Sequence, residues 1–309
     1  MFTIALLCAT ARGLRVFNRL AELVPDARLL VFSFREETWE PPFFDDIRAR
    51  AAEVGAQFHE ARQVGAERWQ PVWDAASPDL LLTVNWRYLV PPPVYRRARL
   101  GAFVFHDSLL PAYRGFSPTV WAMINGEDHT GATLLTMADG YDEGDIVGQM
   151  RVDIGPDDTI AAVTERVTEV YLALLEMHLP ALLAGQAPRT PQDHSAATYT
   201  CKLLPDDMRI DWAWPTARTH NLIRAVTAPY PGAHTTLDGQ RLTIWQAERL
   251  PLARQYVGRV PGRVVEVRPG AGAVVLTGDG ALLLTRIQLE GAEPASADAV
   301  LNRLSHTLR

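Results

Sequence analysis

The sequence predicts an α/β domain with a mostly parallel sheet, followed by a smaller antiparallel barrel. Apolar runs alternate with helix-period segments up to about residue 185, which is typical of parallel sheets covered by helices. After residue 198 the pattern changes to short apolar runs separated by Gly-containing turns. A polar, Pro-containing segment at 186–198 lies between the two patterns. We therefore predict domains at 1–185 and 199–309, joined by a linker at 186–198.

Composition supports this division and limits the function. The chain has 309 residues, of which 48% are hydrophobic and 21% are charged, enough for two buried cores. A formal net charge of −6 gives no general attraction to nucleic acid or to an anionic membrane. Cys8 and Cys201 are far apart and have no zinc-site spacing, so we expect no metal and a reducing, cytoplasmic location. We expect neither a signal peptide nor a membrane span, and no pattern predicts an oligomeric state.

The elements of the first domain follow from their hydrophobic periods. Residues 2–8 predict a buried strand, and a helix follows with Leu14, Phe17, Ala21 and Val24 on one face. The turn between them lacks GxGxxG, so no dinucleotide site is predicted. An acidic, aromatic segment with a double proline, FREETWEPPFF, predicts a loop. The remaining elements are strands at 27–34, 56–61 and 79–89 and helices at 45–55 and 159–185.

The second domain is predicted to contain one helix and several short strands. The helix is centred on THNLIRAV, and the turns Asp238-Gly239 and Asp279-Gly280 separate apolar runs. The strands are predicted within 234–247, 262–267, 272–277 and 281–289. This succession favours a small antiparallel barrel.

The segment 101–149 carries the candidate site. An apolar run ends on His106, SLLPAYRG follows, and a carboxylate-rich turn containing Asp142 comes after the next apolar run. Open α/β sheets bind ligands at the edge where such strands end. An imidazole oriented by a carboxylate suits proton transfer. Asp139 and Asp145 lie on the same turn as alternatives, and Arg114 is interpreted as a residue that pins the loop.

These residues resemble a known family. HDSLLPAYRG followed by TGATLLTMADGYDEGDI resembles the signature of the 10-formyltetrahydrofolate-dependent formyltransferases, Asn-x-His-x-SLLP with a downstream Asp-x-Gly. ATYTCKLLPDDMRIDW, IRAVTAPYPGAHTTLDGQRLTIWQA and EGAEPASADAVLNRL are similar to the C-terminal barrel of methionyl-tRNA formyltransferase and its relatives. The resemblance implies a Rossmann-like formyltransferase fold followed by an OB-like barrel.

The resemblance also implies site residues and a co-substrate. His106 would polarise the formyl oxygen of 10-formyltetrahydrofolate or shuttle protons, and Asp142 would orient the imidazole or tune its charge. The residues implied to contact the folate are Ser108, Leu109, Leu110 and Pro111, with Trp86 and Tyr88 as aromatic candidates. Main-chain groups and an apolar wall are what a pterin requires.

One position departs from the family pattern. The Asn two residues before the His is Val104 here, and valine cannot donate a hydrogen bond to an oxyanion. Asn85 stands at the end of a strand expected to lie next to the His106 strand. We hypothesise that Asn85 supplies the missing amide.

The sequence leaves more than one candidate for the molecule that receives the formyl group. The tRNA enzyme typically carries a basic loop after its second strand, whereas this chain has the acidic FREETWEPPFF there. YRGFSPTVWAMINGE is closer to formyltransferases that act on amino sugars and other small amines. We therefore favour a small amine, such as a nucleotide-linked amino sugar, with methionyl-tRNA formyltransferase as the alternative. A 10-formyltetrahydrofolate hydrolase and a non-catalytic folate- or RNA-binding protein are the further alternatives.

Overall fold

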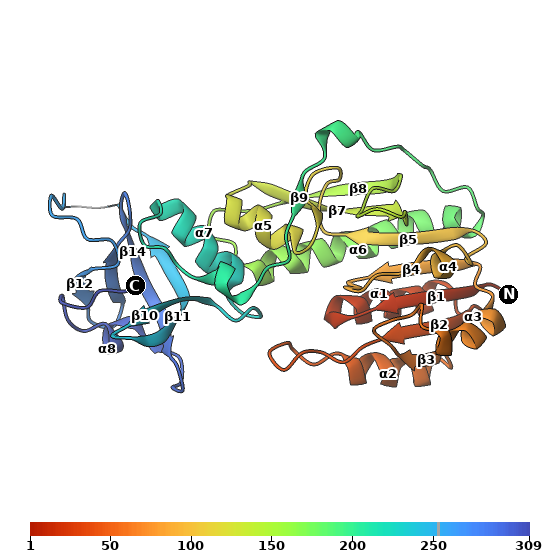
Figure 1. Ribbon diagram of the computed structural model, residues 1–309, viewed down its shortest axis with the longest axis horizontal. Helices are drawn as coiled ribbons and strands as arrows, with labels where there is room; N and C mark the ends of the chain where they lie inside the picture. The colour runs from red at the N-terminus through yellow and green to blue at the C-terminus, as the bar shows by residue number, and fades with distance from the viewer. Residues whose placement is uncertain (252–253) are drawn as a thin grey trace. The chain divides into compact units, whose positions relative to one another are not determined.

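The computed structural model describes residues 1–251 and 254–309, which form two compact units, each with its own sheet (Figure 1). The first unit contains Met1–Pro118, Thr130–Asp153 and Glu165–Thr200. The second contains Thr119–His129, Ile154–Thr164 and Cys201–Arg309. No helix in the described ranges is long and apolar enough to cross a bilayer.

The sheet of the first unit is mostly parallel, as predicted. Its strands are β1 (Thr3–Cys8), β2 (Arg28–Ser33), β3 (Gln57–Glu60), β4 (Leu80–Val84), β5 (Gly101–His106), β7 (His129–Thr136) and β8 (Ile146–Asp153). The order is β3-β2-β1-β4-β5-β7-β8. Pairing is parallel from β3 through β5, whereas β7 runs antiparallel to β5. The carboxyl ends of β1, β4 and β5 therefore lie along one edge.

Helices connect the strands of this unit. They are α1 (Thr10–Leu23), α2 (Phe44–Glu53), α3 (Gln70–Ala76), α4 (Pro92–Tyr95) and α6 (Ile160–Leu183), whereas α5 (Pro118–Asn125) belongs to the second unit from Thr119 onward. Phe17 and Ala21, which share the apolar face predicted for the first helix, are buried. On one face of the sheet, Ala5 and Leu7 pack in a core cluster with Trp73 of α3. On the other face, the Phe105 ring lies 5.0 Å from that of Tyr171 in α6.

Of two neighbouring predictions, the loop after β2 agrees with the structure and the length of the strand β4 does not. The loop predicted at 34–44 is confirmed for residues 34–43, with Phe44 already in α2, and it is anchored where Glu40 accepts a 2.6 Å hydrogen bond from Arg87. The strand predicted at 79–89 is too long, because β4 ends at Val84. Asn85 has a φ of +54°, which leaves the extended region and stops the strand. The chain therefore leaves the sheet at Asn85, at the carboxyl end of β4.

The segment 186–198 packs as part of the first unit. Thr190 forms a β-bridge with Ile146 of β8. Immediately after the segment, β9 (Tyr199–Thr200) pairs with β6 (Arg114–Gly115). A polar stretch with no hydrophobic period is thus held by main-chain hydrogen bonds, which its composition does not indicate.

The second unit contains an antiparallel sheet. Its strands are β10 (Ala233–Leu237), β11 (Gln240–Arg249), β12 (Val264–Arg268), β13 (Gly272–Leu276), β14 (Ala281–Leu289) and β15 (Ala295–Ser296), with helices α7 (Thr216–Val226) and α8 (Ala297–Val300). The main order is β10-β11-β14-β13-β12.

The last residues of the chain close this sheet. Thr236 of the edge strand β10 exchanges main-chain hydrogen bonds of 2.8 and 3.0 Å with Arg309. Beside the opposite edge, Val264 of β12 donates to the carbonyl of His306, and Leu308 donates to that of Gly262. A segment bonded to both edges makes the sheet a barrel, so the predicted barrel architecture is confirmed.

Candidate functional site

The candidate site lies at the carboxyl ends of β4 and β5. Val84, the last residue of β4, pairs with Phe105 of β5. The next residues of the two strands, Asn85 and His106, therefore follow at the same level of the sheet. Val104 shares the face of His106, because side chains alternate along a strand. The order of the strands accordingly places the predicted amide-bearing residue beside the predicted imidazole.

His106 is held between a carbonyl and a carboxylate. Its side chain is 7% exposed, and Nε2 lies 2.8 Å from the carbonyl oxygen of Tyr113. A carbonyl can only accept, so Nε2 carries the proton in this arrangement. Nδ1 lies 3.5 Å from Oδ2 of Asp142. The neutral ring therefore has its lone pair at Nδ1, where a proton taken up would sit next to a negative charge.

The turn after β7 presents Asp142 to the imidazole. Asp142 adopts a left-handed φ of +51°, and its Oδ2 accepts a 2.9 Å hydrogen bond from the main-chain N–H of Gly115. Asp139 is used elsewhere, since it binds Arg96 at 2.9 Å and also accepts from Tyr95. Of these two carboxylates on the turn, Asp142 is the one that the fold brings to His106.

A second ionic cluster supports the backbone next to the imidazole. Asp107 accepts a 2.6 Å hydrogen bond from Arg12 of α1 and another from the hydroxyl of Tyr171 in α6. Burial alone would raise the pKa of Asp107, but the Arg12 guanidinium and these hydrogen bonds hold it below its ordinary value. Burial, together with the nearby Asp107 charge, raises the pKa of Tyr171. Asp107 therefore stays ionised and ties the end of β5 to two helices.

The loop predicted to lie along the folate is ordered by its own contacts. Ser108 donates its hydroxyl proton to the carbonyl of Ala112 at 2.7 Å, and the N–H of Leu110 donates to Thr133. Leu109 lies over Gly131 of β7, where an added Cβ would come within 2.4 Å of the leucine side chain. The loop, which includes Pro111, is thus held in a defined position after His106 by these contacts.

The aromatic candidates form a cluster at the end of β4. The rings of Trp86 and Tyr88 lie 5.3 and 4.9 Å from that of Phe34, in edge-to-face contact. Trp86 Nε1 and Asn85 Oδ1 are both buried and have no hydrogen-bond partner among residues 1–251 and 254–309. Two buried polar atoms without partners are costly unless something else binds them, so this end of β4 has polar capacity left for a ligand.

Sequence reasoning missed Gln192, whereas it singled out Arg114 as a residue that pins the loop. Gln192, in the segment predicted as a linker, is 6% exposed and donates hydrogen bonds to the carbonyls of Asp142 and Gly144. Arg114, predicted to pin the loop, is 1% exposed and binds the Gln192 side chain. A glutamine in a polar stretch carries no local signal of such a role.

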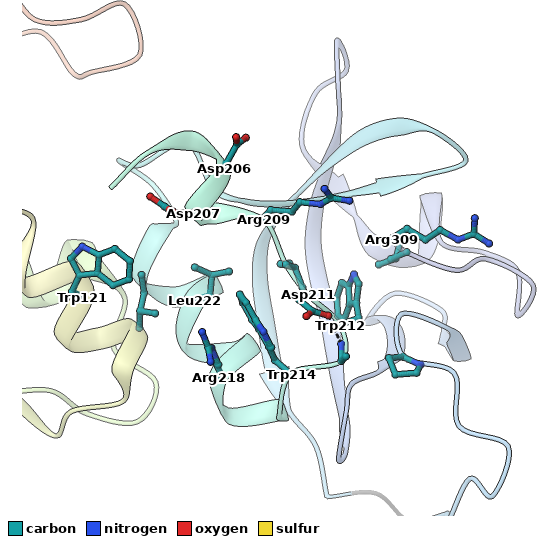
Figure 2. A pocket seen from close by; sticks show the side chains of 15 residues that line it. Trp121, Asp206, Asp207, Arg209, Asp211, Trp212, Trp214, Arg218, Leu222 and Arg309 are labelled. Atoms are coloured by element: carbon teal, nitrogen blue, oxygen red, sulfur yellow. Dashed lines mark hydrogen bonds between the residues drawn. The ribbon is translucent and has the colours of Figure 1, made fainter. Parts of the chain in front are cut away.

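A separate cavity of about 690 Å³ lies within the second unit, and Figure 2 shows it from close by. Trp121, Trp212 and Trp214 line it, and the Arg218 guanidinium stacks over the Trp214 ring at 4.3 Å. Its charged side chains are Asp206, Asp207, Asp211, Arg209, Arg218 and Arg309. Acidic and basic groups balance here, so the cavity offers no excess of positive charge to a polyanion. Within the described ranges, no cluster of His, Cys, Asp and Glu could hold a metal ion.

Fold and site together define an α/β protein with a His–carboxylate pair at the carboxyl edge of its sheet and a C-terminal β-barrel. Two family models match this chain. "Formyl transferase" matches residues 33–177, and "Formyl transferase, C-terminal domain" matches residues 202–305. The chain belongs to the formyl transferase family, which confirms the predicted family and its fold.

Solved structures share this fold at low sequence identity. HypX from Aquifex aeolicus in complex with tetrahydrofolic acid is 20% identical, with a TM-score of 0.62 over 97% of this chain and 47% of that one. This chain therefore spans about half the length of HypX. An N-formyltransferase from Helicobacter canadensis, in complex with folinic acid and dTDP-3-aminofucose, is 14% identical, with a TM-score of 0.65 over 96% of this chain and all of that one.

A third similar structure belongs to a tRNA enzyme. Methionyl-tRNA formyltransferase from Clostridium thermocellum is 16% identical, with a TM-score of 0.60 over 81% of this chain and 94% of that one. At these identities the likeness describes the fold and leaves the acceptor open.

Proposed function

We propose that this protein transfers the formyl group of 10-formyltetrahydrofolate to the amino group of a small acceptor, such as a nucleotide-linked amino sugar. The observation that carries the proposal is the placement of His106 between the Tyr113 carbonyl and Asp142, in a chain of the formyl transferase family. Two solved structures of the same fold are complexes with tetrahydrofolic acid and with folinic acid. The unpartnered polar atoms of Asn85 and Trp86 fit the need of a folate for hydrogen bonds beside an aromatic wall.

The proposed reaction needs a base and a charge-stabilising donor. The amine nitrogen attacks the formyl carbon, a new C–N bond forms, and negative charge develops on the formyl oxygen. His106 Nδ1 takes the proton released by the amine, and Asp142 stabilises the resulting imidazolium. The bond from the formyl carbon to the folate nitrogen then breaks, and that nitrogen takes the proton held by His106, which returns the imidazole to its neutral form. The products are an N-formyl amine and tetrahydrofolate.

The charge of two surfaces favours a small acceptor over tRNA. In the loop at 34–44, Glu40 binds Arg87 at 2.6 Å and Glu37 lies 3.4 Å from Arg62, so nearby cations are already engaged. The second-unit cavity carries balanced charge. A tRNA-binding surface requires unengaged cations for phosphates. Both surfaces lack the positive excess that this would need.

The direct test incubates the protein with 10-formyltetrahydrofolate and either a panel of amino-sugar nucleotides or charged initiator tRNA. We expect N-formyl sugar in the mass spectrum, in step with loss of the formyl group from the folate. Formylation confined to the tRNA, with binding that weakens steeply as salt rises, would replace our acceptor by the alternative. Formate released without any amine would indicate a hydrolase, and folate binding without turnover a binding protein.

Asn85 is expected to donate a hydrogen bond to the formyl oxygen in place of the amide absent at Val104. Removing one such donor typically costs ~10²–10³-fold in rate. We therefore expect Asn85→Ala to lower kcat roughly a hundredfold, measured with saturating donor and acceptor. Asn85→Asp is the matched control, because it keeps the shape and the left-handed backbone but removes the N–H donor, and it should be as impaired. Turnover of Asn85→Ala within a few-fold of wild type would end the hypothesis.

A further inference from the structure

One short segment contacts both loops of the proposed site. We call residues 190–200 the strap. Its first residue, Thr190, exchanges main-chain hydrogen bonds of 2.8 and 2.9 Å with Ile146, just beyond the Asp142 turn. Near its other end, Thr198 accepts hydrogen bonds from the N–H groups of Tyr113 and Arg114, both at 2.8 Å. The strap therefore joins the loop that holds His106 to the turn that holds Asp142.

Gln192 forms the centre of this connection, and every hydrogen-bonding group of its amide is used. Nε2 donates to the carbonyl oxygens of Asp142 at 2.8 Å and Gly144 at 2.7 Å. Oε1 accepts from Nε of Arg114 at 3.1 Å and from its Nη2 at 2.6 Å. Only an amide can donate to two carbonyls and accept from a guanidinium at the same time. The contacts at position 192 thus require a side-chain amide, which glutamine supplies.

The residue that Gln192 holds has a left-handed backbone. Asp142 has a φ of +51°, a conformation that few non-glycine residues adopt and that Asp and Asn adopt most readily. Its carboxylate is bound by the N–H of Gly115, the residue after Arg114. At Gly115, which has a φ of +103°, an added Cβ would meet the carbonyl oxygen of Thr200 in the strap at 2.7 Å. The strap thus reaches Asp142 both through Gln192 and through Gly115.

We propose that Gln192, supported by Arg114, is a positioning residue that holds the Asp142 carboxylate in place against His106. Its kinetic consequence rests on the proposed formyl transfer, whereas its structural consequence does not. The Gln192 amide fixes the position of the Asp142 turn through its hydrogen bonds to the turn carbonyls. The position of the turn in turn determines where Asp142 Oδ2 lies relative to the His106 imidazole. Gln192 thus acts through the turn, since its amide bonds to Arg114 and to the carbonyls of Asp142 and Gly144.

Gln192→Glu separates positioning from general stability. The carboxylate still accepts from Arg114 and gains an ion pair, but it cannot donate to the carbonyls of Asp142 and Gly144. We expect kcat to fall roughly ten- to a hundredfold, as small displacements of catalytic groups do, while KM for the folate donor stays within about twofold. Gln192→Met, which removes both sets of bonds, should show the same kinetic pattern with lower thermal stability. Gln186→Ala, an exposed glutamine just before the strap, should match wild type.

A double-mutant cycle tests whether the effect passes through Asp142. In an Asp142→Asn background, Gln192→Glu should cost less than about twofold, because the charge that it positions is already gone. A loss that persists undiminished in that background would overturn the proposal, as would wild-type kcat in Gln192→Glu.

Hydrogen exchange provides a readout that does not depend on turnover. In Gln192→Glu the amides of residues 138–147 should exchange faster than in wild type, while Gln186→Ala leaves them unchanged. Unchanged protection of this turn would refute the positioning role even if formyl transfer is observed. If wild type transfers no formyl group, the proposed function fails, and the exchange comparison still decides what Gln192 holds.

Discussion

Replacing His106 with alanine is expected to lower kcat for formyl transfer about a thousandfold, within the ~10²–10⁴-fold range of positioned proton transfer. The imidazole is the group whose lone pair, at Nδ1, faces a carboxylate 3.5 Å away while Nε2 is committed to the Tyr113 carbonyl. Without it, the attacking amine must release its proton to water. The measurement is initial-rate kinetics at saturating folate and acceptor.

A second His–Asp pair in this chain is a matched control for His106. His129 Nδ1 lies 2.5 Å from Asp128 Oδ1, but this pair is at the surface, where Asp128 is 83% exposed. His129→Ala should therefore keep wild-type kcat. Equal activity of the two alanine variants would remove His106 from the mechanism. Preserved thermal stability of His106→Ala would show that its lost activity is chemical, since the variant gives up the hydrogen bond to the Tyr113 carbonyl without unfolding the site.

Replacing Asp142 with asparagine is expected to lower kcat on the order of 10²–10³-fold, because a neutral amide cannot stabilise the imidazolium that forms when His106 takes a proton. Asparagine tolerates the left-handed conformation of this position. Its side-chain oxygen can still accept from the N–H of Gly115. The substitution therefore removes the charge and leaves the turn, and KM for the folate should change far less than kcat.

Asp139 supplies the control on the same turn. It is 62% exposed and binds Arg96, so Asp139→Asn should change kcat by less than about twofold. An inactive Asp139→Asn together with an active Asp142→Asn would mean that the carboxylate had been assigned to the wrong residue. The paired variants distinguish the two carboxylates, because each removes one negative charge from the same turn and keeps the side-chain shape.

Much of the first unit was predictable because its signals are local. The buried strand at Thr3–Cys8 and the helix that follows it come directly from hydrophobic period. The end of α6 was indicated by Gly185, which adopts a φ of +67°. The end of β4 was predicted too late, because WRYL continues the apolar pattern while the backbone at Asn85 turns out of the strand.

The sequence by itself indicated the main alternation of strands and helices and the family, and it pointed to His106 and Asp142 as candidates, because each depends on residues close together or on a specific motif. It did not predict α3 (Gln70–Ala76), which is too short to show a helical period. The tertiary structure alone decided that β7 runs antiparallel to β5, that residues 306–309 close the barrel, and that Gln192 holds the Asp142 turn. These are pairings between segments far apart in the chain, made largely by main-chain groups that every residue carries. Such contacts leave no mark on local composition, so only the folded chain reveals which polar residue has a partner.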